Sequence, residues 1–368
     1  MKIPYTRPSI TNLEVEFATD AATNGWGQKC YEYIEKFEKS FAKYLGVKHC
    51  IATSSCTGAM QIGLDAIGIE PGDEIILADT NWIATAAPII HLGAKPIFVD
   101  ILPSTWCIDP QKVIKSLNSK TRAVIATHLY GNLCEIEELK KICLDAQIVL
   151  IEDAAEAIGS SIGSSKAGAM SEFSTFSFHG SKTITTGEGG ILATNNSEIY
   201  EKSLTLSNHG RAKNQNKQFW PDEIGYKFKM SNVQAAIGVA QLKRVEDLVQ
   251  RKREILEHYK YNFKGLDSIS MNPELSGTVN GAWMPTVVLD KSLGIDQTQL
   301  LNAFTEQKID ARVFFWPLSS LPMFTKILSN KNSYDIPKRS INLPSFHDIR
   351  DDQINQISET IINLVANR

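Results

Sequence analysis

Short apolar runs alternate with amphipathic segments through the first half of the chain. The clearest runs occupy residues 74–79, 95–100, 122–127, 148–153, 174–179 and 189–194. They are too short for helices and rich in Val and Ile, as expected for strands buried on both faces, and helical segments such as 135–146 lie between them. The alternation predicts an α/β domain whose parallel or mixed sheet is covered by helices.

The pattern changes at Ser231, where a helical periodicity begins and continues without a break for several turns. Ser231 and Gln234 have the spacing of a capping box, so one long helix is expected to start there. Further short β-rich runs and an amphipathic segment at 351–366 are typical of a small α+β domain. We therefore predict a large α/β domain over residues 1–235, followed by the linking helix and a small C-terminal domain over residues 236–368.

Composition narrows the class of partner. The 368 residues carry 38 basic and 41 acidic side chains without a charged run, which disfavours a nucleic-acid or membrane-surface partner. No apolar stretch reaches the roughly 18 residues of a membrane span, and the start of the chain lacks a signal-peptide core. The six cysteines form no C-x-x-C pair, which indicates reduced thiols and no metal site. We expect a cytoplasmic enzyme with a small-molecule substrate.

Two residues that follow predicted strands carry candidate chemistry. Asp153 ends one run, and ligands of open α/β sheets bind at the carboxyl ends of strands, although an Asp there also caps turns. Lys182 follows another run among Ser, Thr and Gly. A desolvated amine in such a place forms Schiff bases, whereas a lone lysine is more often a solvated surface residue. The P-loop, S-x-x-K and G-x-G-x-x-G motifs are all missing.

A cluster of small hydroxyl residues at 52–60 runs into a helix that is expected to begin near Thr57. Backbone N–H groups at a helix N-terminus, with Ser and Thr hydroxyls, form phosphate sites, although an isolated cluster is by default a helix cap. Trp82 follows another strand, where an indole either stacks on a planar ring or packs in the core. With Asp153 and Lys182, these residues supply what pyridoxal phosphate (PLP) needs: a phosphate cradle, a stacking aromatic, a carboxylate and a lysine.

The same segments resemble a known family. FSFHGSKTITTGEGG, IEDAAEAIGS, SSCTGAM and GYKFKMSNVQAAIGVAQL are similar to motifs of the DegT-type nucleotide-sugar aminotransferases, and the resemblance covers nearly the whole chain. It implies the fold-type I PLP architecture, with a mixed, mostly parallel sheet in the large domain. Within the family, the pattern is similar to the GDP-perosamine synthase group, which converts a GDP-linked 4-keto-6-deoxyhexose into a 4-amino sugar in surface-polysaccharide biosynthesis.

The resemblance assigns a role to each candidate residue. Lys182 would form the Schiff base with PLP, and Asp153 would pair with the pyridine nitrogen. The other implied cofactor contacts are Cys56, Thr57 and Ser177 at the phosphate, Trp82 on the ring, Glu156 near the phenolic oxygen, and Lys227 from the partner subunit of a homodimer. Substrate contacts are expected from Arg312, Trp316 and Ser319.

Departures from the family pattern leave the ketone open. Ser319 stands where the family often has histidine, Lys227 where it usually has asparagine, and GWGQKC replaces an early family motif. The amino group, by resemblance from glutamate, would go to a nucleotide-linked 4-keto-6-deoxyhexose or to a smaller phosphorylated ketone such as dihydroxyacetone phosphate. Two further functions stay open: a PLP-dependent sugar 3-dehydratase, in which histidine replaces the Schiff-base lysine, and a PLP-binding protein without turnover.

Overall fold

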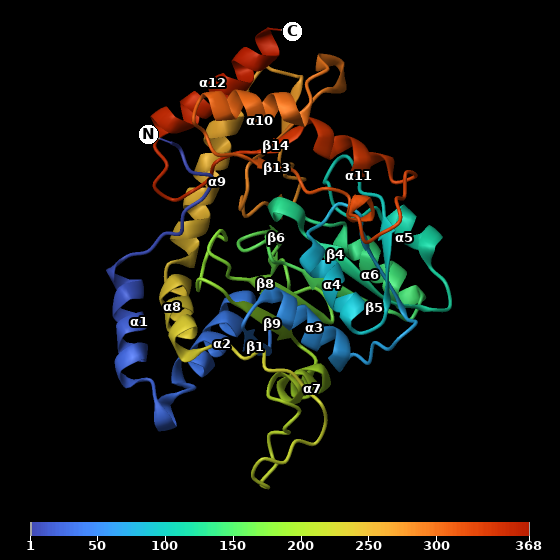
Figure 1. Ribbon diagram of the computed structural model, residues 1–368, viewed down its shortest axis with the longest axis vertical. Coiled ribbons are helices and arrows are strands. Elements are labelled where there is room, and N and C mark those ends of the chain that lie inside the picture. Colours follow the sequence, from blue (N-terminus) through green and yellow to red (C-terminus); the bar gives the residue numbers. More distant parts are fainter. Residues whose placement is uncertain (1, 368) are drawn as a thin grey trace.

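The structure is a computed structural model that describes residues 2–367, and its centre is a seven-stranded sheet (Figure 1). The strands are β1 (His49–Thr53), β2 (Glu74–Ala78), β3 (Lys95–Val99), β4 (Thr121–Thr127), β5 (Val149–Asp153), β8 (Phe173–Ser177) and β9 (Gly190–Thr194). They lie in the order β1-β9-β8-β5-β4-β2-β3. All neighbours from β8 to β3 are parallel, and β9 runs antiparallel to both β8 and β1. Every strand that the apolar runs predict is present.

Helices cover both faces of this sheet. They are α1 (Asn12–Asn24), α2 (Glu32–Leu45), α3 (Cys56–Ala66), α4 (Ile83–His91), α5 (Pro110–Ser116), α6 (Ile136–Asp145) and α7 (Ser197–Ser207). Alternate side chains of β2 enter different cores: Ile76 packs in the cluster that holds residues of α5 and α6, while Ile75 and Leu77 pack with α3 and α4. Burial on both faces explains why the strands read as continuous apolar runs.

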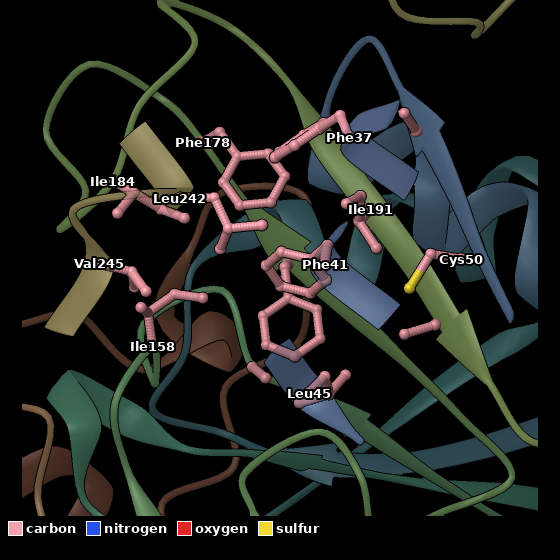
Figure 2. Packing of buried hydrophobic residues seen from close by; sticks show 14 of the residues in the cluster. Phe37, Phe41, Leu45, Cys50, Ile158, Phe178, Ile184, Ile191, Leu242 and Val245 are labelled. Carbon is pink, nitrogen blue, oxygen red and sulfur yellow. The ribbon is translucent and has the colours of Figure 1, made fainter. Parts of the chain in front are cut away.

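Helix α2 illustrates how tightly the covering layer is packed (Figure 2). Phe37 and Phe41 lie four residues apart on one face of the helix, and both are fully buried. The Phe178 ring, just beyond β8, lies 5.2 Å from that of Phe37. Burial of each such ring stabilises the fold by about 1.5–3 kcal/mol. Gly238 lies on a second helix that packs against α2, and a Cβ atom there would lie 2.8 Å from the Phe37 ring. A larger side chain at this position would push that helix away from α2.

A second, four-stranded antiparallel sheet has the order β10-β12-β14-β13. Its strands are β10 (Ile269–Met271), β12 (Thr286–Leu289), β13 (Arg312–Val313) and β14 (Ser340–Asn342), and its helices are α10 (Gln297–Glu306), α11 (Lys331–Asp335) and α12 (Asp351–Ala366). The shorter strands β6 (Ser161–Ile162), β7 (Ser165–Lys166) and β11 (Thr278–Val279) form a third sheet. This small α+β unit beside the large α/β unit confirms the fold-type I architecture; the boundary at residue 235 stays a prediction.

The linking segment corrects one prediction. The helix expected as a single element from Ser231 is two helices, α8 (Asn232–Leu242) and α9 (Val245–Asn262). The capping box of Ser231 and Gln234 is present at its start. Arg244 leaves the helical conformation, with φ −113° and ψ 7°, and donates to the Glu14 carboxylate at 2.8 Å. The break lets α8 pack on α1 and α2 while α9 runs up to the second sheet (Figure 1). Periodicity alone does not reveal this break, because the apolar face continues through it.

Three further observations concern the described residues as a whole. Between residues 2 and 367, no helix is both long and apolar enough to cross a membrane, and no group of His, Cys, Asp and Glu side chains is arranged to hold a metal ion. The six cysteines are free thiols, and four of them are buried.

Candidate active site

Asp153 is the last residue of β5 and is almost fully buried at the carboxyl end of the large sheet. Its carboxylate accepts a hydrogen bond from the Thr85 hydroxyl at 2.6 Å and one from the Ala155 N–H at 3.1 Å. The two donors fix the plane of the carboxylate, since each holds a different oxygen. Asp153 is therefore an oriented anion at a ligand-binding edge of the sheet and not an ordinary turn cap.

Lys182 lies in the loop between β8 and β9, and its side chain is only 12 % exposed. Its Nζ lies 3.4 Å from a carboxylate oxygen of Glu156 and 3.6 Å from the centre of the Trp283 ring. The other Glu156 oxygen accepts the Tyr130 N–H at 2.9 Å. Burial raises the pKa of Glu156, the nearby Lys182 ammonium lowers it, and the charge of Asp153 raises it further. The three ionisable groups predicted for the cofactor thus lie close enough to act on one another.

The N-terminus of α3 provides the predicted phosphate cradle. Cys56 and Thr57 are its first two residues, both half-buried, and Ser55 caps the helix by accepting the Gly58 N–H at 3.0 Å. The first backbone N–H groups of a helix have no partner within it, so they bind anions. A Cβ atom at Gly190, on β9, would lie 2.4 Å from the Cys56 nitrogen, which explains a glycine at that position.

Strand β8 lines the space between the cradle and Asp153. Thr175 pairs directly with Asp153 across the two strands, and Ser177 lies two residues further along the same face. The Thr175 hydroxyl is buried without a hydrogen-bond partner within residues 2–367. Such an orphaned group is what a site that takes a polar ligand leaves behind. Burial and the charge of Asp153 raise the pKa of the Cys56 thiol, so this side chain stays neutral beside the cradle.

Trp82 is the N-cap residue of α4 and is 58 % exposed, so it is not a core tryptophan. It stands three residues before Thr85, whose hydroxyl holds Asp153. The closest aromatic neighbour is Phe315, at 5.8 Å between ring centres. An open indole face beside an oriented carboxylate suits a planar, cationic ring.

Lys227 is not brought to these groups within its own chain. The segment that carries it runs along α3, where the Phe228 carbonyl accepts the Ser54 N–H at 2.6 Å and the Phe228 ring packs on Gly58. Because side chains alternate along an extended segment, Lys227 points to the opposite side from Phe228. It is exposed, and it makes no side-chain hydrogen bond or ion pair with any described residue.

Of the three predicted substrate residues, Trp316 and Arg312 are exposed and Ser319 is buried. Trp316 is 48 % exposed, and the pairing of Pro317 with Thr80 places this segment beside the one that carries Trp82. Arg312 is exposed, pairs with Asp310 and lies over the Tyr5 ring, with 4.9 Å between the guanidinium carbon and the ring centre. Tyr5 lies between Arg312 and Glu156 electrostatically, because both residues act on its hydroxyl. Burial raises the pKa of Tyr5, the charge of Glu156 raises it further, and the charge of Arg312 lowers it.

Ser319 does not face a substrate in this structure. It is fully buried, and its hydroxyl donates to Asp79 at 2.7 Å and lies 2.9 Å from the Tyr334 hydroxyl. Asn330 donates to the same Asp79 oxygen. Ser319 therefore ties the loop after β13 to the end of β2, and it is left out of the proposed substrate site.

Three contacts in the site have no counterpart among the predictions. Thr85 orients Asp153, Trp283 covers the Lys182 ammonium, and Tyr130 donates its N–H to Glu156 from a left-handed conformation with φ 56°. Thr85 lies one helical turn after Trp82, but no helix is predicted over that segment, so its contact with Asp153 has no signal in the sequence. Trp283 gives no signal either, since it lies far along the chain in a segment that reads only as the start of a strand.

The profile of the DegT/DnrJ/EryC1/StrS aminotransferase family matches residues 8–362 of the chain. The chain belongs to this family. Among curated relatives, it is 37 % identical to a GDP-perosamine synthase of Vibrio cholerae over 98 % of both chains. It is 35 % identical to the GDP-perosamine synthase of Escherichia coli O157:H7, over 98 % of this chain and 97 % of the relative.

Solved structures agree with this DegT-family fold. Helicobacter pylori PseC, an aminotransferase involved in the biosynthesis of pseudoaminic acid, superposes with a TM-score of 0.91 at 24 % identity, and all of both chains is covered. A Streptococcus pneumoniae structure in its PLP form has a TM-score of 0.93 at 24 % identity, over 100 % of this chain and 99 % of that one. This DegT-family member is a PLP-dependent aminotransferase.

The residues present fit PLP. The α3 N-terminus with the Thr175 hydroxyl suits the phosphate, Asp153 suits the pyridine nitrogen, and the Lys182 amine suits the aldehyde. When bound, PLP supplies an electron sink that stabilises negative charge at the carbon next to the reacting nitrogen. A protonated ring nitrogen strengthens that sink, and an oriented, buried carboxylate is the group that keeps it protonated.

Thr85→Val is expected to weaken PLP binding by about tenfold or more, because a hydrogen bond to a charged group is worth about 1.5–3 kcal/mol. The substitution removes the donor at 2.6 Å from Asp153 and keeps the volume and branching of the side chain. The dissociation constant is measured by absorbance titration of the cofactor-free protein. Thr85→Ser is the matched control and should bind as wild type. Equal affinity in the Val variant would contradict the orienting role of Thr85.

Proposed function

We propose that this enzyme aminates the keto group of a nucleotide-linked 4-keto-6-deoxyhexose, with glutamate as the amino donor, in the biosynthesis of a surface polysaccharide. The observation that carries the proposal is the buried cluster of Lys182, Glu156 and Asp153, with the exposed Trp82 three residues before the threonine that holds Asp153. The substrate class is supported by the two relatives named GDP-perosamine synthase, which match almost the whole chain.

Each residue has a defined task in this proposal. Lys182 would hold the cofactor through its amine, and its Nζ is the base that would move a proton at the donor's Cα. Asp153 keeps a proton on the pyridine nitrogen. Glu156, whose pKa is raised by burial, would lie near the phenolic oxygen. Trp82 covers the ring, and Cys56 offers its N–H to the phosphate.

The substrate is expected to enter over the exposed side of the site. Trp82 and Trp316 come from neighbouring segments there, and both are about half exposed, so they form an apolar platform for a sugar. Arg312, exposed on β13, would provide a cation for the diphosphate of a nucleotide. A sugar nucleotide has both an apolar ring face and a diphosphate, which a small keto phosphate lacks.

A substrate panel tests this proposal. The protein is first converted by glutamate to its amino form, and nucleotide-linked 4-keto sugars and dihydroxyacetone phosphate are then added separately. Recovery of the original absorbance with a keto sugar supports the proposal. Recovery with dihydroxyacetone phosphate alone would assign the smaller substrate, and loss of a sugar hydroxyl without amination would indicate a 3-dehydratase. A protein that glutamate leaves unchanged would be a PLP-binding protein or would use another donor.

We also propose a homodimer in which Lys227 contacts the PLP phosphate of the partner subunit. Lys227 is exposed, is directed away from the α3 cradle of its own chain and has no partner among residues 2–367. The segment just before Lys227 exposes large apolar side chains, since Phe219 is 88 % and Ile224 is 95 % exposed. Monomers rarely leave such residues uncovered. A twofold interface would give each subunit the same contact.

Mixing Lys182→Ala with Lys227→Ala subunits is expected to raise activity above that of either parent. In a mixed dimer with shared sites, one site lacks both lysines and the other is intact. Each parent alone is impaired, since a charge-assisted phosphate contact is worth roughly 1.5–3 kcal/mol of cofactor binding. Each parent carried through the same exchange protocol serves as control. No rise, despite verified subunit exchange, would place Lys227 outside the partner's site.

A further inference from the structure

Lys252, on α9, is a buried lysine that the proposed mechanism does not use. It is 6 % exposed, and no carboxylate within residues 2–367 lies within ion-pair distance of it. Burial lowers its pKa to about 7. The ammonium donates to the Ser345 carbonyl at 2.6 Å, to the Ser345 hydroxyl at 2.9 Å and to the Trp283 carbonyl at 3.4 Å. These three hydrogen bonds compensate for burial of the amine, and they tie the Ser345 and Trp283 backbones to α9.

One of these acceptors, the Trp283 carbonyl, connects Lys252 with the reactive lysine, Lys182. The Trp283 indole N–H donates to the Ser181 carbonyl at 2.8 Å, and its ring centre lies 3.6 Å from the Lys182 Nζ. The ring is almost fully buried, so a shift of the Trp283 backbone would move the ring relative to the amine. Lys252 holds that backbone through its carbonyl oxygen.

The second acceptor, Ser345, leads to the same peptide by a different route. Its N–H donates to the Tyr5 carbonyl at 2.9 Å, and the hydroxyl of the next residue, Thr6, donates to the Ser181 carbonyl at 3.5 Å. The Ser181 carbonyl, directly before Lys182, is therefore reached by two chains of contacts that both begin at Lys252. One ammonium on α9 fastens the N-terminal segment and the Trp283 segment around the reactive lysine.

We propose that Trp283 and Lys252 position the reactive amine: the indole face of Trp283 holds Lys182, and Lys252 holds Trp283. The proposal rests on the proposed function only in that Lys182 is the residue that binds the cofactor. Lys252 is a positioning residue, because it touches neither cofactor nor substrate. Through it, the helix that leads to the small domain helps set the position of the amine.

Acylation of Lys182 in the cofactor-free, full-length protein tests the proposal. A limiting amount of acetic anhydride is added, and modification of Lys182 is followed over time by peptide mass spectrometry. The amine is now shielded by the indole, so Lys252→Met should increase its labelling rate by roughly 3- to 30-fold, the factor by which a cation–π contact of this kind holds a group in place. Lys252→Arg keeps N–H donors at this position and should restore a rate near that of wild type.

Controls separate positioning from stability. Lys260→Met removes another lysine from the same helix, which within residues 2–367 pairs only with Glu257, and should leave the rate unchanged. Trp283→Leu removes the ring itself and should accelerate labelling at least as much as Lys252→Met, which keeps the test available if Lys252→Met does not fold. In the holoenzyme, both variants should shift the pH midpoint of the cofactor absorbance.

Wild-type labelling in a folded Lys252→Met variant, as judged by thermal unfolding, would overturn the role of Lys252. Wild-type labelling in Trp283→Leu would overturn the whole proposal. Covalent cofactor at a lysine other than Lys182 would instead refute the proposed function, and the labelling rates would still report whether Trp283 and Lys252 hold Lys182.

Discussion

Lys182→Ala is expected to abolish covalent attachment of PLP and to lower turnover by about 10⁴-fold or more, because one side chain provides both the covalent link and the base. Its Nζ is the only lysine amine described within 4 Å of the buried Glu156, so no neighbouring lysine is placed to replace it. The substitution removes the contacts with Trp283 and Glu156 and introduces no larger side chain, so the fold should persist.

Attachment is measured by reducing the protein with borohydride and locating the modified peptide by mass spectrometry. Lys140→Ala, on the outer surface of α6, is the control and should keep both attachment and activity. A reduced cofactor on any other lysine of the variant would contradict the assignment. Residual turnover within tenfold of wild type would contradict the role of Lys182 as base.

The second large effect is expected for Asp153→Asn, which should bind PLP and lose about two to four orders of magnitude in transamination rate. The amide is nearly isosteric and still accepts the Thr85 hydroxyl, so the geometry at 2.6 Å can persist. It cannot keep a proton on the pyridine nitrogen by charge. The loss should therefore fall on the rate of conversion by glutamate and much less on cofactor affinity.

Single-turnover absorbance measurements with glutamate separate the two quantities. Asp145→Asn, at the exposed end of α6, makes the same chemical change away from the site and should react as wild type. Wild-type single-turnover rates in Asp153→Asn would show that the carboxylate does not act on the ring nitrogen. Failure to bind PLP at all would show that Asp153 is needed for binding rather than for chemistry.

Much of the fold follows from local sequence pattern. The buried strands read as apolar runs because both of their faces are covered, and the capping box at Ser231 lies where a helix begins. The order of the strands and the antiparallel direction of β9 have no local signal, because both depend on pairings between distant segments. The break between α8 and α9 has no local signal for the same reason: Arg244 turns away to meet Glu14, 230 residues earlier in the chain.

The candidate site is predictable to a similar extent. Asp153 and Lys182 follow strands, and the Ser/Thr cluster precedes a helix. The neighbouring residues are therefore enough to predict that these groups lie at the ligand-binding edge of the sheet. Ser319 is assigned to the substrate only by its place in a family motif, and its burial against Asp79 depends on the tertiary fold. Trp283 and Lys252 are linked to the Lys182 loop by hydrogen bonds to backbone carbonyls. Every residue has a backbone carbonyl, so the sequence does not indicate which one a side chain will bind.

The strand order also has a consequence for how the protein is made. Strand β1, which ends at the phosphate cradle, pairs in the large sheet only with β9, and their partners His49 and Thr194 are separated by most of the large domain. A nascent chain that has not yet emerged past residue 194 leaves β1 as an unpaired strand, with the edge exposed to other chains. Because pairings between distant segments form slowly, we expect the cradle to close late and the cofactor to enter a nearly finished domain. A chaperone that shields the unpaired strand during synthesis should therefore raise the yield of folded protein more than added cofactor does.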